Sequence, residues 1–125
     1  MSEKKKILIA DDEPQVRLLI SNILNKDYTI LVASDGQQAI DIAVRQKPDL
    51  ILMEIMMPKV DGYHACSTIK TNRITKKIPV VMLSGVDHEL NKEFATKVGA
   101  GGYITKPFSS QELLDTIGRF LKCPG

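Results

Sequence analysis

Five short apolar segments alternate with amphipathic segments along the 125-residue chain, and this alternation constrains the fold more than any other feature. The apolar segments are rich in β-branched residues and too short for helices, which is typical of strands. They cover residues 7–10, 29–33, 50–53, 79–83 and 102–105. Regular alternation of strands and helices predicts an α/β fold with a parallel sheet.

The segments between the strands carry apolar residues at helical spacing. The first predicted helix starts at Pro14, and its buried stripe is formed by Val16, Leu19, Ile20, Ile23 and Leu24. Leu18 lies outside this stripe and is expected to be exposed. A second helix contains residues 39–44 and ends before Pro48, and a third runs from about Gly62 to Lys70.

The last two predicted helices differ in how firmly they are held. The helix around residues 88–98 has only Leu90, Phe94 and Val98 on its apolar side, so we expect it to be the most loosely packed. The final helix begins at Ser109 or Ser110, because a serine can cap a helix. Its buried side is predicted to contain Leu113, Leu114, Ile117 and Leu121.

Length, charge and cysteine content exclude several classes of protein. With 43% hydrophobic residues, the 125 residues suffice for one domain with a core but not for two. No apolar run reaches the roughly 18 residues that span a bilayer, and the N-terminal region lacks a signal peptide, which together predict a cytoplasmic protein without membrane contact. The net charge of +2 predicts no direct nucleic-acid binding. Cys66 and Cys123 are interpreted as reduced thiols.

Polar residues follow four of the predicted strands at the ends where such folds bind ligands. Consecutive β-α units with right-handed crossovers make a doubly wound sheet, whose ligands lie beyond the carboxyl ends of the strands. These ends carry Asp11, Asp12 and Glu13 after the first strand, Glu54 after the third, Ser84 after the fourth and Lys106 after the fifth. If the first and third strands are neighbours, the carboxylates of Asp11, Asp12 and Glu54 share one crevice.

This set of side chains favours phosphate chemistry at a magnesium site. Three carboxylates in a partly desolvated crevice repel one another unless a cation or protons relieve the repulsion. Hard oxygen ligands favour Mg²⁺, which commonly pairs one or two carboxylates with a phosphate. The hydroxyl of Ser84 and the ammonium of Lys106 suit the remaining phosphoryl oxygens. The structural alternatives are a helix cap at Asp12 and Glu13, a turn at Ser84 and a solvated Lys106.

Four segments of the sequence together resemble the receiver domain of two-component response regulators. They are residues 7–13, 48–62, 80–85 and 102–108, and the resemblance extends from about Lys5 to Leu121. It implies a flavodoxin-like α/β fold, a doubly wound sheet of five parallel strands in the order 2-1-3-4-5 with five helices. It also implies that residues 1–125 form a single receiver domain.

The resemblance implies a role for each matching residue of the crevice. Asp11 and Asp12 correspond to the acidic pair that holds Mg²⁺ or Mn²⁺, with Glu54 and the backbone carbonyl of Met56 as further ligands. Ser84 corresponds to the hydroxyl that shifts toward a bound phosphoryl group, and Lys106 to its charge partner.

Residues around the crevice also match the family. Tyr103 resembles the aromatic switch residue that turns inward on activation; the structural alternative is an ordinary half-buried strand residue. The bond that precedes Pro107 is expected to be cis. Met56 and Val86 would flank the path of the water that attacks a phosphoryl group, and because both are bulky and apolar we expect slow self-hydrolysis.

Glu54 departs from the family at the position of the aspartate that accepts phosphate from a histidine kinase. Its extra methylene moves the carboxylate outward by about 1.5 Å, and a 1 Å misplacement can cost about 100-fold in rate. Three consequences remain open: Glu54 imitates a phosphorylated aspartate, or it is inert and leaves a phosphorylation-independent interaction module, or it accepts phosphate slowly. Every residue around it fits a working site, which is compatible with a natural or an introduced substitution.

The leading hypothesis is a stand-alone receiver that passes signals through protein contacts and is not an enzyme, with at most latent phosphotransfer and self-dephosphorylation. No output domain follows Gly125 in this sequence, so output is expected to go to a downstream effector protein through the fourth helix, fifth strand and fifth helix. The expected upstream partner is a histidine kinase or phosphotransfer protein, with Leu18 as a candidate contact. The chain is expected to be a monomer or weak dimer.

Two other classes fit the sequence less well. A metal-dependent phosphatase with an aspartyl nucleophile needs Asp-x-Asp after the first strand, whereas Glu13 holds the third position here. A flavin or nucleotide carrier needs a phosphate-binding loop at that place, where Asp11 and Asp12 would repel phosphate.

Overall fold

The structure, a computed structural model, describes residues 4–85 and 92–121 and has one five-stranded parallel sheet at its centre. The strands are β1 (Lys6–Ala10), β2 (Thr29–Ala33), β3 (Leu50–Glu54), β4 (Val80–Ser84) and β5 (Gly102–Thr105). Their order across the sheet is β2-β1-β3-β4-β5, and all four pairings are parallel. The predicted fold class and strand order are therefore confirmed.

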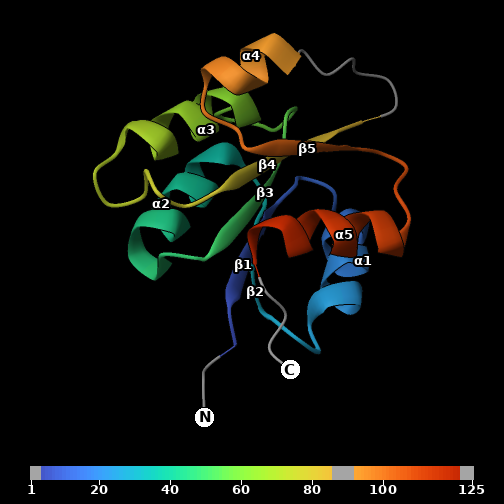
Figure 1. The fold of residues 1–125 in the computed structure, drawn as a ribbon. Helices are drawn as coiled ribbons and strands as arrows, with labels where there is room; N and C mark the ends of the chain where they lie inside the picture. Colours follow the sequence, from blue (N-terminus) through green and yellow to red (C-terminus); the bar gives the residue numbers. More distant parts are fainter. Residues whose placement is uncertain (1–3, 86–91, 122–125) are drawn as a thin grey trace.

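Five helices cover the two faces of the sheet (Figure 1). They are α1 (Pro14–Leu24), α2 (Gly36–Gln46), α3 (Gly62–Thr71), α4 (Lys92–Lys97) and α5 (Ser110–Phe120). Helices α1 and α5 lie on one face, and α2, α3 and α4 lie on the other. The arrangement is a three-layer α/β/α sandwich.

The strands are apolar on both sides because each face of the sheet has its own core. In β1, Ile7 and Ile9 pack toward α1 and α5, whereas Leu8 and Ala10 pack toward α2 and α3. All residues of β3 and β4 are buried, which leaves their carboxyl ends as the place where polar side chains meet.

Two predictions of buried helical side chains are wrong. Ile20 and Leu24 of α1 are buried, but Leu19 is 51% exposed, and Leu114 of α5 is 39% exposed while Leu113 is buried. Successive helical residues are rotated by about 100°, so the neighbour of a buried residue lies on the flank of the helix and needs another element to cover it. Leu18 is 62% exposed, as expected.

Helix α4 also differs from the sequence-based expectation. Its buried residue is Ala95, whereas Phe94 is 42% exposed and packs edge-to-face on Tyr63 of α3, with ring centroids 4.7 Å apart. Leu90, which was expected to help hold this helix, lies outside the described residues. The short helix is therefore fixed by a small alanine in the core and an aromatic contact at its rim.

Helices α1 and α5 differ in how their N-terminal ends are capped. The side chain of Ser109 accepts a hydrogen bond from the Glu112 amide, and Glu112 completes a capping box, so Ser109 is the cap. In α1 the cap position is Glu13, whose side chain makes no capping hydrogen bond, and Pro14 begins the helix. The structural alternative that Asp12 caps α1 is therefore wrong.

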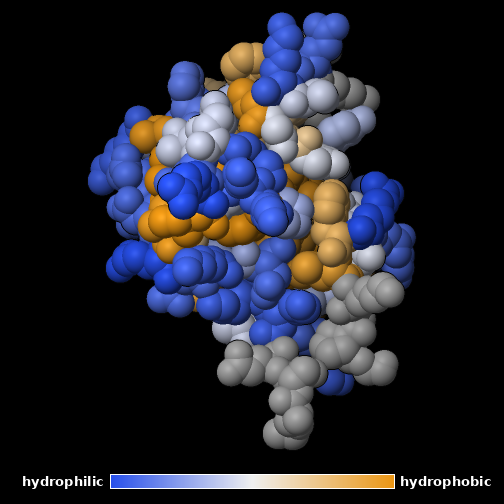
Figure 2. Space-filling view, turned by 60° about the vertical axis from the view of Figure 1, so that its left-hand side comes forward, coloured by the Kyte–Doolittle hydropathy of each residue, from blue (hydrophilic) through white to orange (hydrophobic). Residues whose placement is uncertain are grey.

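One face of the molecule is largely polar (Figure 2). Figure 2 shows hydrophilic side chains over much of the face that carries α2 and α3, with apolar side chains visible between them. Among the described residues, no helix has the length and apolar character needed to span a bilayer. The thiol of Cys66 is buried, which raises its pKa to about 11, and Cys123 lies outside the described residues.

Candidate functional site

The sheet topology brings the polar strand ends together. Strands β1 and β3 are direct neighbours, with Ala10 opposite Met53, so the residues that follow them, Asp11 and Glu54, lie side by side. Strand β4 lies next to β3 and ends in Ser84, opposite Thr105 of β5. Asp11, Glu54 and Ser84 are all buried, although they are polar.

Lys106 is the centre of the site. Its Nζ atom lies 2.8 Å from Asp11 Oδ2, 2.8 Å from Glu54 Oε2 and 3.7 Å from Glu13 Oε1. The Lys106 side chain is only 13% exposed, and its backbone amide donates a hydrogen bond to the Ser84 carbonyl at 2.7 Å. The alternative of a solvated surface lysine is therefore wrong.

Every polar group of Asp11 takes part in a hydrogen bond. Its amide donates to the Ala33 carbonyl at 3.1 Å, Oδ1 accepts from the Glu13 amide at 2.9 Å, and Oδ2 accepts from Lys106. Its carbonyl accepts a hydrogen bond of 2.7 Å from Nη1 of Arg17. Sequence reasoning missed Arg17, whose only signal is that it lies in the first turns of α1, four residues after Glu13.

Asp12 is placed differently from its neighbour. It is exposed, and among the described residues no group of three or more His, Cys, Asp or Glu side chains is arranged to hold a metal ion. Asp11 and Glu54 are thus brought together through Lys106, while the Asp12 side chain lies toward solvent. This arrangement is compatible with Mg²⁺, which needs only one or two carboxylates and keeps several of its waters.

The Glu54 carboxylate is the least satisfied group of the site. Its Oε2 atom forms an ion pair with Lys106 at 2.8 Å and, among the described residues, is a buried oxygen with no further partner. Two buried carboxylates face one buried ammonium, which leaves an excess of negative charge that a divalent cation would offset. The donor atoms are all oxygens, as Mg²⁺ prefers.

Burial and nearby charges shift the pKa values of Glu54 and Lys106. Burial raises the pKa of the Glu54 carboxyl above its usual value, and the nearby Lys106 ammonium only partly counteracts this effect. Burial by itself would lower the pKa of Lys106, but its contacts with Asp11 and Glu54 outweigh burial, and its pKa is raised overall.

Glu54→Gln is expected to become more stable relative to the unaltered chain as pH rises above about 4.5. Because the folded-state pKa of Glu54 is raised above the unfolded value of 4.5, folding favours its protonated form, and this stability is lost as pH rises through the folded pKa. Glutamine does not ionise and removes this loss. Urea unfolding of both chains between pH 4.5 and 8 measures the difference, and a difference that stays constant with pH contradicts the raised pKa.

Glycine allows the segment after β3 to pack closely on the site. The amide of Gly62, the first residue of α3, donates to the Ile55 carbonyl at 2.7 Å. A Cβ atom at Gly62 would lie 2.1 Å from the Glu54 carbonyl oxygen. The start of α3 therefore rests directly on the end of β3, which fixes the backbone of Glu54.

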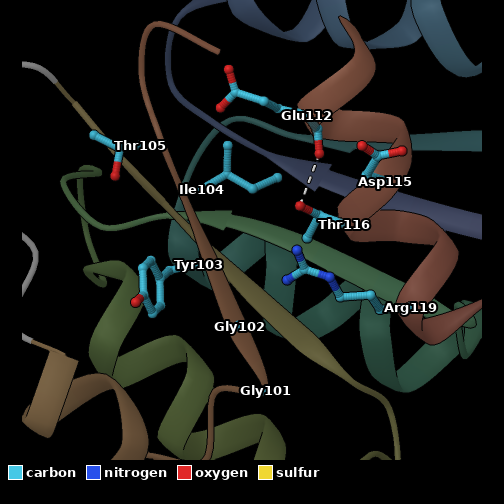
Figure 3. Close-up of a pocket in the computed structure, with 9 residues that line it drawn as sticks. All are labelled: Gly101, Gly102, Tyr103, Ile104, Thr105, Glu112, Asp115, Thr116 and Arg119. Carbon is cyan, nitrogen blue, oxygen red and sulfur yellow. Dashed lines mark hydrogen bonds between the residues drawn. The ribbon is translucent and has the colours of Figure 1, made fainter. Parts of the chain in front are cut away.

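The remaining predicted residues lie around this centre. Met56 is 51% exposed, and Val86 lies outside the described residues. The Lys106–Pro107 peptide bond is cis. Tyr103 is 44% exposed and lines a hollow of about 530 Å³ between β5 and α5, where its side chain and that of Ile104 leave the strand on opposite sides (Figure 3).

Sequence comparison identifies relatives of the whole chain. The model of the response regulator receiver domain family matches residues 7–118. The alkaline phosphatase synthesis transcriptional regulatory protein PhoP of Bacillus subtilis is 40% identical over 119 residues, which cover 94% of this chain and 49% of that protein. The probable transcriptional regulator ycf27 of Guillardia theta is 34% identical over 123 residues, which cover 98% of this chain and 47% of that protein. The chain thus spans about half the length of the curated relatives it matches.

Solved structures share the fold over nearly the whole chain. The chemotaxis protein CheY4 of Vibrio cholerae has a TM-score of 0.87 and 29% identity, covering 95% of this chain and 100% of that one. The receiver domain of the sensor histidine kinase PA1611 of Pseudomonas aeruginosa has a TM-score of 0.85 and 29% identity, and the match covers 94% of this chain and 98% of that one. That structure has a magnesium ion coordinated in its active site cleft. The BeF3-activated receiver domain of RstA from Klebsiella pneumoniae has a TM-score of 0.85 and 32% identity, and the match covers 94% of this chain and 99% of that one.

The strand order, the polar residues at the strand ends and the match of the family model over residues 7–118 all indicate the same family. The chain belongs to the response regulator receiver domain family of two-component signalling.

Proposed function

We propose that this receiver signals through protein contacts and that Glu54 makes it a poor phosphoryl acceptor. One observation carries the proposal: the Glu54 carboxylate, at the end of β3, is buried and already lies 2.8 Å from the Lys106 ammonium. The carboxylate extends one methylene further than an aspartate would, into the space next to the cation that would otherwise meet an incoming phosphoryl oxygen. Acceptance then requires breaking this ion pair and retracting the side chain.

Asp11, Asp12, Glu54 and the Met56 carbonyl are the groups that would hold Mg²⁺ in this site. Bound there, the ion supplies positive charge for one phosphoryl oxygen. Ser84 would donate its hydroxyl to a second oxygen, and Lys106 would offer its ammonium to a third. The excess of buried negative charge around Asp11 and Glu54 supports this assignment.

Glu54 alone does not hold the domain in an activated state under this proposal. A phosphorylated side chain carries roughly 1.5 to 2 negative charges and three acceptor oxygens, whereas Glu54 offers one charge and two oxygens. The exposure of Tyr103, at 44%, supports an outward position of this residue in the presence of Glu54. Incomplete mimicry of charge and shape explains why the ring need not turn inward.

The proposal implies two kinds of partner. A histidine kinase or phosphotransfer protein would approach the strand ends, with Leu18 of α1 as a candidate contact. A downstream effector would contact the surface of α4, β5 and α5, which includes Tyr103 and the hollow beside it (Figure 3). The same surface would serve a phosphorylation-independent interaction module, so phosphoryl uptake is what separates the two functions.

Intact-mass measurement with Mg²⁺ and a small phosphodonor, on this chain and on Glu54→Asp in parallel, tests the proposal. We expect the aspartate variant to gain the mass of a phosphoryl group, and this chain to gain it about 100-fold more slowly, because the reacting oxygen is displaced by more than 1 Å. Equal rates would overturn the assigned role of Glu54. Uptake by neither chain would favour the phosphorylation-independent module.

A further inference from the structure

Arg17 lies beside the acidic segment without touching any of its carboxylates. Its guanidinium Nη1 donates a hydrogen bond of 2.7 Å to the main-chain carbonyl of Asp11. The contact is partly buried and joins the first turns of α1 to the loop that follows β1. An arginine whose guanidinium is bound to a main-chain carbonyl, with the nearest acidic residue, Glu13, four positions before it in the sequence, is placed for a role other than charge pairing.

The carbonyl of Asp11 is the remaining polar group of this residue, and its hydrogen bond with Arg17 anchors the loop after β1 directly before Asp12. The Asp11 amide is bound to Ala33 of β2, and its two carboxylate oxygens are bound to the Glu13 amide and to Lys106. The carbonyl belongs to the peptide group that joins Asp11 to Asp12. A hydrogen bond to that carbonyl therefore sets the plane of the peptide from which Asp12 projects.

We propose that Arg17 is a positioning residue for magnesium: it holds the Asp11–Asp12 peptide so that the exposed Asp12 carboxylate is presented to the ion together with Asp11. The inference rests on the metal site of the proposed function. Outer contacts that orient metal ligands typically change metal affinity by about 10- to 100-fold when they are removed. Arginine suits this task because its planar guanidinium fork is pre-organised, so less side-chain entropy is lost for each hydrogen bond that it forms.

The charge of Arg17 predicts the opposite effect on magnesium affinity. A fixed positive charge near the site repels Mg²⁺, so its removal would strengthen binding if charge were all that mattered. Loss of positioning would weaken binding instead. The sign of the change in the dissociation constant therefore distinguishes a positioning residue from a bystander cation.

Calorimetric titration of Mg²⁺ into the unaltered chain, Arg17→Gln, Arg17→Met and Arg17→Lys tests the inference. We expect about 10-fold weaker binding in Arg17→Gln and Arg17→Met, and partial recovery in Arg17→Lys, whose ammonium can still donate to the carbonyl. Arg45→Gln is the matched control, since Arg45 also donates to a main-chain carbonyl, that of Asp41 in α2, but on an exposed face. Its magnesium affinity is expected to be unchanged.

Three outcomes would overturn the inference. Unchanged or tighter magnesium binding in Arg17→Gln and Arg17→Met would leave Arg17 as a bystander, while the proposed metal site would stand. Circular dichroism monitors thermal unfolding of the three Arg17 variants. If none of them unfolds cooperatively, Arg17 serves the fold rather than the site. Absence of saturable binding to the unaltered chain would remove the metal site itself and the inference with it.

Discussion

Replacing Lys106 with methionine is expected to lower the free energy of unfolding by about 3–5 kcal/mol at neutral pH. The Lys106 ammonium is the cation between two carboxylates that are almost fully buried, at 2.8 Å from each. Methionine preserves the length and much of the volume of the side chain but removes its charge. Asp11 and Glu54 are then left buried beside each other without a compensating cation, and that penalty dominates the effect.

Urea unfolding at pH 7.5 measures this loss, and Lys59→Met serves as its control. Lys59 also faces a carboxylate, that of Asp35 at 3.8 Å, but its side chain is 71% exposed, so we expect a change below about 1 kcal/mol. The deficit of Lys106→Met should shrink toward pH 5, because an unpaired buried Glu54 is neutralised by protonation. A loss below 1 kcal/mol, or one independent of pH, would contradict the central role of Lys106.

Replacing Gly62 with alanine is expected to destabilise the fold by roughly 3 kcal/mol, at the upper end of overpacking effects. The added Cβ would lie 2.1 Å from the Glu54 carbonyl oxygen and 2.9 Å from its carbonyl carbon. Both atoms belong to the main chain of a buried strand, so no side chain can rotate away. Relief requires α3 to move off β3, which also shifts the backbone of Glu54.

Gly118→Ala in α5 is the matched control for this prediction. A Cβ at Gly118 meets nothing within 4 Å, and alanine is favoured over glycine inside a helix by about 0.5–1 kcal/mol. We therefore expect Gly118→Ala to raise the melting temperature and Gly62→Ala to lower it, as followed by circular dichroism. Equal shifts in both variants would show that the contact between Gly62 and Glu54 is not tight.

Periodicity in the sequence was sufficient to predict the elements and their type. Short β-branched runs alternate with helical patterns, and the five strands and five helices follow this pattern with shifts of a residue or two at most of their ends. The serine cap of α5 was predicted for the same local reason, since a cap depends on residues within one turn. Polar residues at the strand ends were also expected to meet, and Asp11, Glu54 and Lys106 do lie together, because carboxyl ends of parallel strands share one edge of the sheet.

The sequence did not predict which flank of each helix the neighbouring elements cover. Leu19 and Leu114 belong to apolar stripes, yet both are more than one third exposed. Burial at a flank depends on whether another helix lies there, and the helical period of one segment carries no information about that. Phe94 was expected on the apolar side of α4 but is 42% exposed, whereas Ala95 is buried, for the same reason.

The sequence by itself determined which polar residues stand at or directly after the strand ends: two aspartates, a glutamate, a hydroxyl and a lysine. Only the tertiary structure decided how these groups are paired. Lys106 joins Asp11 across 95 positions of the chain and takes Glu54 as its second partner, while Arg17 binds the Asp11 carbonyl and Asp12 stays exposed. These pairings follow from burial and from the distances between the groups, which together decide the balance between desolvation and ion pairing. Residue types alone do not encode them.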